Sequence, residues 1–221
     1  LPITNATVRV TGPSSYDQTQ ITDRGFINQT DWSGGEYTFN DGNVETASPA
    51  GELKLRSAFG SYNPSGILES STFDTGSASN FYNLVWSPND QPVQAGPDSA
   101  RFQIATNAVI NATTTWSYLG PDGTSGTYYN SSNMPIASQH NDDRYLRYKL
   151  FLSTISSTST PNISDVAFTF TSSCTPPGQV VFSSLTSGTY NISVSKTGYT
   201  AVDVDVGVST DWKEQEIILA P

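Results

Sequence analysis

The chain has 221 residues, with ten Lys plus Arg against twenty Asp plus Glu, a formal net charge of −10 and 14% charged residues. A surface of this sign repels phosphate backbones and anionic lipid, which argues against nucleic-acid binding. No run of about eighteen apolar residues offers a membrane-spanning segment. The length suits one large or two modest domains. Abundant Ser, Thr, Gly, Asn, Tyr and Val are typical of a secreted or surface all-β protein.

Cys174 is the only cysteine, so no disulfide forms within the chain and the fold must rest on its hydrophobic cores. We expect a partly buried thiol; pairing with another copy is the alternative. Residue 1 is Leu rather than Met, which predicts that a preceding segment, such as a signal peptide or an anchor helix, has been removed. Together these features predict an extracellular or cell-surface location.

The first element in chain order is a strand and turn over residues 3–16, with nothing adjacent to complete it. Residues 177–199, near the other end, have the pattern of strand, turn, strand and turn, with the first strand around Val180 and Phe182. Such a meander is marginal alone and needs further strands. We therefore expect the two chain ends to share one small β-sandwich.

The stretch Asn5-Ala-Thr-Val-Arg-Val-Thr-Gly-Pro13, joined to residues 178–199, resembles the carboxypeptidase-regulatory-like, PEGA or CnaB-like group of transthyretin-type β-sandwiches. The resemblance implies a discontinuous domain of residues 1–24 plus 175–221, interrupted by an inserted domain of residues 25–174. Some related modules carry a Lys–Asn isopeptide bond promoted by a Glu. Serines 193 and 195 stand where that acid is expected, so the crosslink is not carried over.

The inserted region contains short alternating runs separated by turns rich in Pro, Gly, Asn and Asp, which indicates a sandwich or jelly roll. The runs begin near Glu52, Ile67, Phe81, Ala100, Tyr145 and Ile163. No window has helical spacing over three turns, so we expect almost no helix. Trp86 lies in an alternating strand and is expected in the core.

The order of these runs, from Leu68-Glu-Ser-Ser-Thr-Phe-Asp-Thr-Gly76 through Trp86 to Arg144-Tyr-Leu-Arg-Tyr-Lys-Leu-Phe-Leu152, resembles a jelly-roll module of bacterial surface proteins. That module is similar in architecture to discoidin, laminin-G and carbohydrate-binding modules. Similar modules occur in large extracellular and pilin-like proteins. The fold class is therefore predicted as all-β, with a jelly roll inserted into a transthyretin/CnaB-like sandwich formed from both chain ends.

Catalytic chemistry has little support in the sequence. His140 is the only histidine and lies in a turn, Ser138-Gln-His-Asn-Asp-Asp-Arg144, without a nucleophile elbow elsewhere. The carboxylates occur mostly in turns, where they are expected to bind local backbone groups. We expect no catalytic residues and no enzyme activity.

One oxygen-rich string is a candidate calcium site, because Ca²⁺ takes six to eight oxygen ligands. Its ligands would be Asp31, Asn40, Asp41, Asn43 and Glu45. The alternative is a plain Asp-Gly turn without metal. Asp142 and Asp143 form a second candidate. No other cofactor is expected.

Aromatic side chains in or near loops are candidates for stacking on sugar rings, although large aromatics in sandwiches usually pack in the core. They are Trp32, Trp116, Tyr118, Tyr128 and Tyr129. Candidate N-glycosylation sequons lie at Asn5, Asn28, Asn111, Asn130, Asn162 and Asn191.

These features predict a structural subunit or tip module of an extracellular filament, pilus or adhesin, which associates with itself or with other surface-fibre subunits. The first strand is a candidate for donation to a neighbouring copy, because ladder hydrogen bonds form with either chain. The alternative function is a non-catalytic carbohydrate-binding module of a larger secreted protein, with a glycan as its partner.

Overall fold

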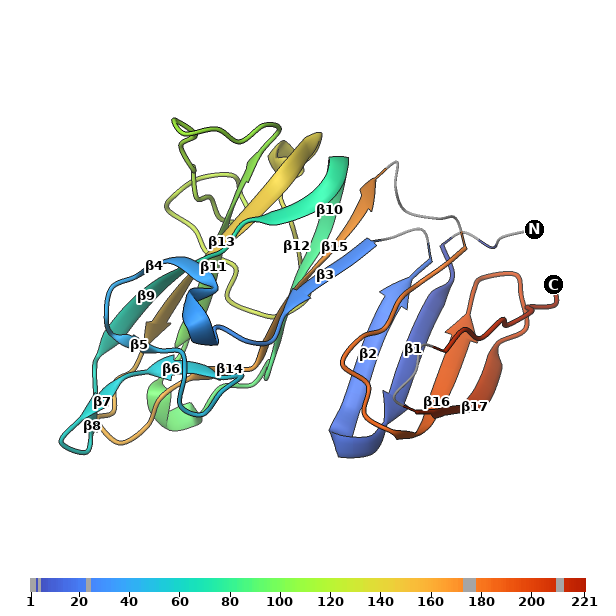
Figure 1. Cartoon of the computed structure of the whole chain (residues 1–221), viewed down its shortest axis with the longest axis horizontal. Helices are drawn as coiled ribbons and strands as arrows, with labels where there is room; N and C mark the ends of the chain where they lie inside the picture. Colours follow the sequence, from blue (N-terminus) through green and yellow to red (C-terminus); the bar gives the residue numbers. More distant parts are fainter. Residues whose placement is uncertain (1–2, 4, 23–24, 173–177, 210–212) are drawn as a thin grey trace. The chain divides into compact units, whose positions relative to one another are not determined.

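The structure is a computed structural model that describes residues 3, 5–22, 25–172, 178–209 and 213–221. The chain forms two compact units (Figure 1). Unit 1 combines Leu1–Phe26 with Cys174–Pro221, and unit 2 is Ile27–Ser173. Strands account for 48% of the residues and helix for 6%, which confirms the all-β class. None of the helices within the described ranges is long and apolar enough to cross a membrane.

Unit 1 is built on one four-stranded sheet to which both chain ends contribute. Its elements are β1 (Thr7–Gly12), η1 (Pro13–Ser15), β2 (Tyr16–Ile21), β16 (Gly188–Ser195) and β17 (Val202–Val208). The strand order is β17-β16-β1-β2, so the blue N-terminal strands lie beside the orange and red C-terminal ones (Figure 1). Both edges of β1 are paired within its own sheet, and donation of this strand to another copy would first have to break these ladders.

The sheet of unit 1 has one apolar face and one polar face, as the alternation of its strands predicts. On the apolar face, Val8 pairs with Val194 and packs with Ala6 and Leu219. On the opposite face, Arg9 forms an exposed ion pair with Asp17.

Irregular segments, rather than a second sheet, cover the apolar face within the described part of unit 1. Val180, Phe182 and Ile217 pack there, yet none of them belongs to a strand. The strand predicted around Val180 is therefore wrong: the segment is held to the sheet by side chains, such as the Gln20 amide that donates to the Val181 carbonyl over 2.6 Å. Cys174 lies outside the described residues.

The remaining elements belong to unit 2, except that β3 begins two residues before it. These are β3 (Gly25–Gln29), η2 (Ser33–Gly35), β4 (Tyr37–Asn40), β5 (Val44–Glu45), β6 (Leu53–Leu55), β7 (Ser57–Ala58), β8 (Ser61–Tyr62), β9 (Ser65–Ser70), β10 (Phe73–Ser87), η3 (Val93–Ala95), β11 (Ala100–Asn107), β12 (Met134–Pro135), η4 (Ser138–His140), β13 (Asp143–Ser153), β14 (Asn162–Ile163) and β15 (Asp165–Ser172). Each predicted run of the inserted region coincides with a strand, in whole or in large part.

The main sheet of unit 2 has the path β3-β15-β10-β13-β9-β4, with β11 joined to β13 and β12 to β10. Two smaller sheets, β14-β6-β5 and β7-β8, complete the unit. Buried aromatic and aliphatic side chains fill the core, and Trp86 is 3% exposed there, which confirms the prediction for this residue. Trp86 packs 4.7 Å from Phe102, measured between ring centroids.

Candidate functional site

Strand β13 places a row of cationic and aromatic side chains on the face of the main sheet that points away from the core. Its even-numbered residues from Leu146 to Leu152 are buried, so the alternation of the strand turns the odd-numbered residues outward. The outward residues include Arg147, Lys149 and Phe151. The segment between β11 and β12 crosses this face and contributes the aromatic partners.

Three of the five predicted sugar-stacking aromatics lie over these residues. The Arg147 guanidinium carbon is 4.3 Å from the centroid of the Trp116 ring. Lys149 Nζ is 5.2 Å from the Tyr118 ring. Tyr128 packs edge-on against Phe151 at 5.2 Å. We call these six residues the cation–aromatic row; such contacts are worth about 0.5–1 kcal/mol each at exposed sites.

Two backbone bridges hold the crossing segment against β11. Leu119 pairs with Ile104, and Tyr129 pairs with Phe102. Because successive side chains of an extended segment point to opposite faces, the bridge at Tyr129 buries that ring and leaves Tyr128 on the outer face. The local register therefore decides which aromatic residues are accessible.

Trp32 and Tyr129 belong to the core rather than to an accessible platform. Both are 0% exposed, so a ligand on the surface cannot stack on either ring. Trp32 Nε1 donates to the Tyr148 hydroxyl at 2.6 Å, and that hydroxyl donates to Gln29 Oε1 at 2.8 Å. The sequence expectation is corrected for these two residues, because a buried Trp with a satisfied N–H is a packing group.

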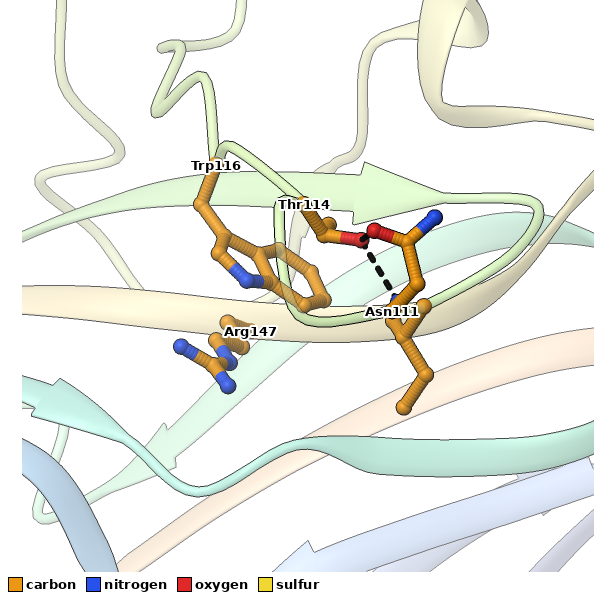
Figure 2. A pocket seen from close by; sticks show the side chains of 5 residues that line it. Asn111, Thr114, Trp116 and Arg147 are labelled. Atoms are coloured by element: carbon orange, nitrogen blue, oxygen red, sulfur yellow. Dashed lines mark hydrogen bonds between the residues drawn. The ribbon is translucent and has the colours of Figure 1, made fainter.

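An open pocket of about 340 Å³ lies at the Trp116 end of the row (Figure 2). We call it the Trp116 pocket; its lining residues are Ile110, Asn111, Thr114, Trp116 and Arg147. A local turn shapes one wall, since the Asn111 N–H donates to Thr114 Oγ1 at 2.8 Å. The Thr113 N–H in turn donates to Asn111 Oδ1 at 2.9 Å. The pocket thus combines an indole, a guanidinium, an amide and a hydroxyl.

The charges along the row are unevenly balanced. Lys149 forms an ion pair with Glu69 at 3.0 Å, and the Tyr118 hydroxyl donates to the same carboxylate at 3.0 Å. Burial and the Glu69 charge raise the pKa of Tyr118, so its hydroxyl stays protonated. Arg147 instead donates to two neutral hydroxyls, Thr72 at 2.7 Å and Thr38 at 3.4 Å.

Sequence reasoning did not select Arg147 or Lys149 as site residues. The signal was present, because the run from Tyr145 to Leu152 alternates apolar and cationic residues. The sequence did not indicate that the aromatic segment folds back over this strand. That contact joins residues about thirty positions apart in the chain, and local periodicity reports only on neighbouring residues.

The predicted calcium ligands mostly bind backbone N–H groups. Asp41 accepts from the N–H of Asn43 at 2.8 Å and of Ile67 at 3.0 Å, and Asn40 Oδ1 accepts from Gly42 at 2.9 Å. Glu45 accepts from the Ala47 N–H, and the Asp31 carboxylate binds Ser33. Across the described ranges, no group of three or more His, Cys, Asp and Glu side chains is placed to hold a metal. Calcium at this loop stays a prediction.

His140 is a buried residue, 2% exposed, whose Nδ1 lies 3.0 Å from Thr106 Oγ1. Its Nε2 has no hydrogen-bond partner among the residues that the structure describes. Burial lowers the pKa of His140 to about 4, with a smaller opposing effect from Asp143. The imidazole is therefore neutral at physiological pH.

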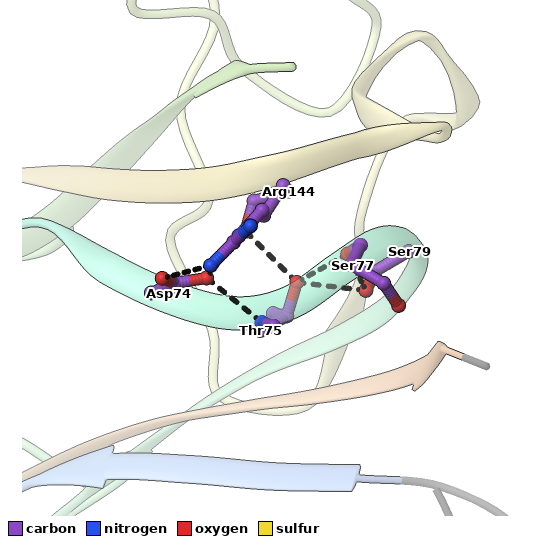
Figure 3. Close-up of polar contacts among 6 residues, drawn as sticks. Asp74, Thr75, Ser77, Ser79 and Arg144 are labelled. Atoms are coloured by element: carbon purple, nitrogen blue, oxygen red, sulfur yellow. Dashed lines mark hydrogen bonds and ion pairs between the residues drawn. The ribbon is translucent and has the colours of Figure 1, made fainter. Parts of the chain in front are cut away.

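A second polar cluster lies where the register of β10 against β13 shifts, between Asp74 and Ser79 (Figure 3). Arg144 forms a bidentate pair with Asp74, at 2.6 and 2.7 Å. The buried Thr75 hydroxyl donates to the Arg144 carbonyl at 2.8 Å and accepts from Ser79 Oγ at 2.8 Å. These groups satisfy one another, which suits a structural turn rather than a ligand site.

The sequons differ in accessibility. Asn5, Asn111 and Asn130 are exposed, whereas Asn28, Asn162 and Asn191 lie half-buried in strands. The Asn191 amide also donates to Asp205 at 2.9 Å. Because Asn111 lines the Trp116 pocket, a glycan attached there would occupy it. Use of the sequons stays a prediction.

Comparison with known proteins adds little to this geometry. No protein-family model matches the sequence, and no curated protein matches it either. The crystal structure of chitosan-binding module 1 from the chitosanase/glucanase of Paenibacillus sp. IK-5 is similar, with 13% identity, a TM-score of 0.28, and coverage of 66% of this chain and 95% of that module. The CnaB-like classification of unit 1 stays a prediction.

Proposed function

We propose that this chain is a non-catalytic, extracellular binding protein that holds a glycan in the Trp116 pocket. The observation that carries the proposal is the placement of a half-buried indole beside a guanidinium, a hydroxyl and an amide in an open pocket. The apolar faces of sugar rings stack on indole rings. The sugar hydroxyls form hydrogen bonds with polar groups such as these. The pocket volume lies near the lower end of ligand pockets, which span roughly 300–1,000 Å³.

The two-sided environment of Trp116 supports this role. One side of the indole contacts Arg147, which fixes the ring, while the residue also lines the open pocket. A ring fixed before binding loses little conformational entropy when a ligand arrives. Trp116 is therefore suited to be the stacking residue of the site.

A glycan array screened with the native chain and with Trp116→Ala tests the proposal. We expect the native chain to bind a defined set of glycans and the variant to lose binding by about five-fold or more, because ring stacking on an aromatic side chain contributes about 1 kcal/mol. Tyr199→Ala is a matched control, since Tyr199 is also an exposed aromatic beside a cation, Lys196. Protein produced without N-glycosylation keeps Asn111 free. If the native chain binds no glycan, the proposal is wrong.

A structural role in a filament, pilus or adhesin is the second candidate, favoured by the hairpin of β7 and β8. Phe59 occupies its turn with a φ of 53° and is fully exposed, followed by Gly60 with a φ of 81°. A bulky residue in the left-handed region is uncommon, and a fully exposed Phe gains nothing from burial within its own chain. Contact with a further subunit would bury this ring.

Sedimentation and electron microscopy of the native chain and of Phe59→Ser test the second candidate. A structural subunit should associate in a concentration-dependent way, and the variant should remain monomeric. Phe39→Ser is a control, since Phe39 is a second exposed Phe, at 46%. A native chain that is monomeric at every concentration would count against self-association through Phe59.

A further inference from the structure

The charge state of the Trp116 pocket narrows the class of glycan that it suits. In the part of the chain that the structure describes, four cationic side chains form ion pairs: Arg9, Arg56, Arg144 and Lys149. Arg147 is not among them, although it lies on the same strand as two of the paired residues. Its partners are neutral groups, namely the hydroxyls of Thr72, Thr38 and Tyr118 and the ring of Trp116.

The acidic residue closest in register to Arg147 already has an ion-pair partner and a hydrogen-bond partner. Glu69 stands opposite Lys149 across the β13–β9 ladder and binds both Lys149 Nζ and the Tyr118 hydroxyl. No acidic residue lines the pocket itself. A guanidinium has five N–H donors, and those of Arg147 that bind protein groups meet only uncharged oxygens.

A positively charged wall is unusual for this protein, because the net charge of the chain is −10. A neutral sugar would leave the Arg147 guanidinium without a direct carboxylate partner among the described residues. A ligand carboxylate or sulfate would instead form a charge-assisted hydrogen bond, which is roughly twice as strong as a neutral one. Arginine is also the residue type best suited to recognise such planar or tetrahedral anions.

We propose that the ligand of the Trp116 pocket is an acidic glycan, whose carboxylate or sulfate group pairs with Arg147 while a sugar ring stacks on Trp116. The inference rests on the proposed glycan-binding function and adds the charge of the ligand to it. Thr114 and Asn111 on the opposite wall would meet the hydroxyl groups of the same sugar (Figure 2).

The test measures binding of matched glycans to the full chain by calorimetry. The probes are uronate oligosaccharides, the same oligosaccharides after reduction of their carboxyl groups, and sulfated oligosaccharides. We expect an acidic member to bind about ten-fold or more tighter than its neutral counterpart, which is the usual effect of one charge-assisted hydrogen bond. Comparison of the uronate and sulfate arms identifies the anionic group.

Three variants test whether Arg147 causes the preference for acidic glycans. Arg147→Gln should abolish the preference for the acidic probe, and Arg147→Lys should keep part of it because the charge remains. Arg56→Gln removes the same charge from a residue that does not line the pocket, and its binding should match the native chain. If Arg147→Gln does not fold, a nuclear magnetic resonance titration of the native chain replaces it. The Arg147 Nε–H signal is expected to shift with the uronate probe and not with its carboxyl-reduced counterpart, and equal shifts with both would overturn the inference.

The outcomes separate the two proposals. Equal affinity for acidic and neutral members, unchanged in Arg147→Gln, would overturn the acidic ligand while leaving the glycan site in place. Acid preference that persists in Arg147→Gln would place the anion elsewhere and also overturn the inference. Failure of the native chain to bind any probe or any glycan of the array would overturn the proposed function itself.

Discussion

Arg147 and Trp116 form a stacked pair on the outer face of unit 2, with 4.3 Å between the guanidinium carbon and the ring centroid. The pair joins β13 to the segment between β11 and β12, which also contacts the sheet through two isolated bridges and through Tyr118 and Tyr128. The contribution of this pair to the free energy of folding should be small, since an exposed cation–π contact contributes about 0.5–1 kcal/mol. The indole is therefore available for binding without being required for folding.

Trp116→Ala should lower the free energy of unfolding by only about 1 kcal/mol, the value of one such contact. Trp86→Ala should cost about 3–5 kcal/mol, because it removes a large ring from the core. Urea denaturation followed by circular dichroism measures both. A loss in Trp116→Ala as large as that in Trp86→Ala would show that Trp116 is a core residue.

Tyr148→Phe should destabilise unit 2 by about 1–3 kcal/mol, since the removed hydroxyl leaves buried polar groups of Trp32 and Gln29 unpaired. Thermal unfolding monitored by tryptophan fluorescence reports the change. Tyr62→Phe is the control, because Tyr62 is half-buried against the same core and its hydroxyl forms no hydrogen bond within the described part of the chain. Equal stability of the two variants would contradict the role of the buried network.

Gly12→Ala should destabilise unit 1, because the added Cβ would lie 2.2 Å from Cδ1 of the buried Tyr190 ring. Overpacking of this kind costs about 1–3 kcal/mol. At Gly207, in β17, a Cβ would meet nothing within 4 Å, so Gly207→Ala should change stability by less than about 0.5 kcal/mol. Amide hydrogen exchange of β16 measures both variants, and matching exchange rates would refute the close approach.

Stability should fall as the pH is lowered from about 6.5 to about 4 because of His140. Its pKa is about 4 in the folded chain against an ordinary value of 6.5, so the unfolded chain binds the proton first. The stabilisation is complete above pH 6.5 and decreases on acidification, by about 3 kcal/mol in total. His140→Asn lacks the titrating imidazole. The difference in unfolding free energy between the native chain and the variant should therefore become smaller as the pH falls through this range. A difference independent of pH would contradict the lowered pKa.

Thr75→Val should cost about 1–3 kcal/mol, since its hydroxyl is buried and serves the backbone of β13. Asp74→Ala, which removes the exposed ion pair with Arg144, should cost no more than about 1 kcal/mol. Chemical denaturation ranks the two. The reverse order would mean that the ion pair, rather than the hydroxyl, holds the shifted register of β10 against β13; both groups are shown in Figure 3.

Local periodicity predicted most of the strands because the alternation of buried and exposed residues follows from strand geometry. Trp86 and the run beginning at Tyr145 are examples. The same rule was insufficient for the adjacent pair Tyr128 and Tyr129, which occupy opposite faces: only the pairing partner, Phe102, determines which ring is buried. Val180 was assigned to a strand from its pattern, but its segment finds its partners through side chains instead of a ladder.

Residue type indicated the aromatic half of the candidate site and not the cationic half. Trp116 was selected because it lies in a loop, and Trp32 was selected for the same reason although it is buried. Arg147 stands on a strand distant in sequence from Trp116. Its role depends on a tertiary contact and on the absence of an acidic partner within the described residues, and neither is encoded in local spacing.

The pairing of β1 with β16 also bears on how the protein responds to mechanical tension. A pull applied at the two flanks of the chain would load the β1–β16 and β16–β17 ladders directly. The whole of unit 2 lies between β2 and β16 in the sequence and would remain outside the load path while those ladders hold. In a surface fibre, the proposed binding site at the Trp116 pocket would thus be shielded from tension that unit 1 carries.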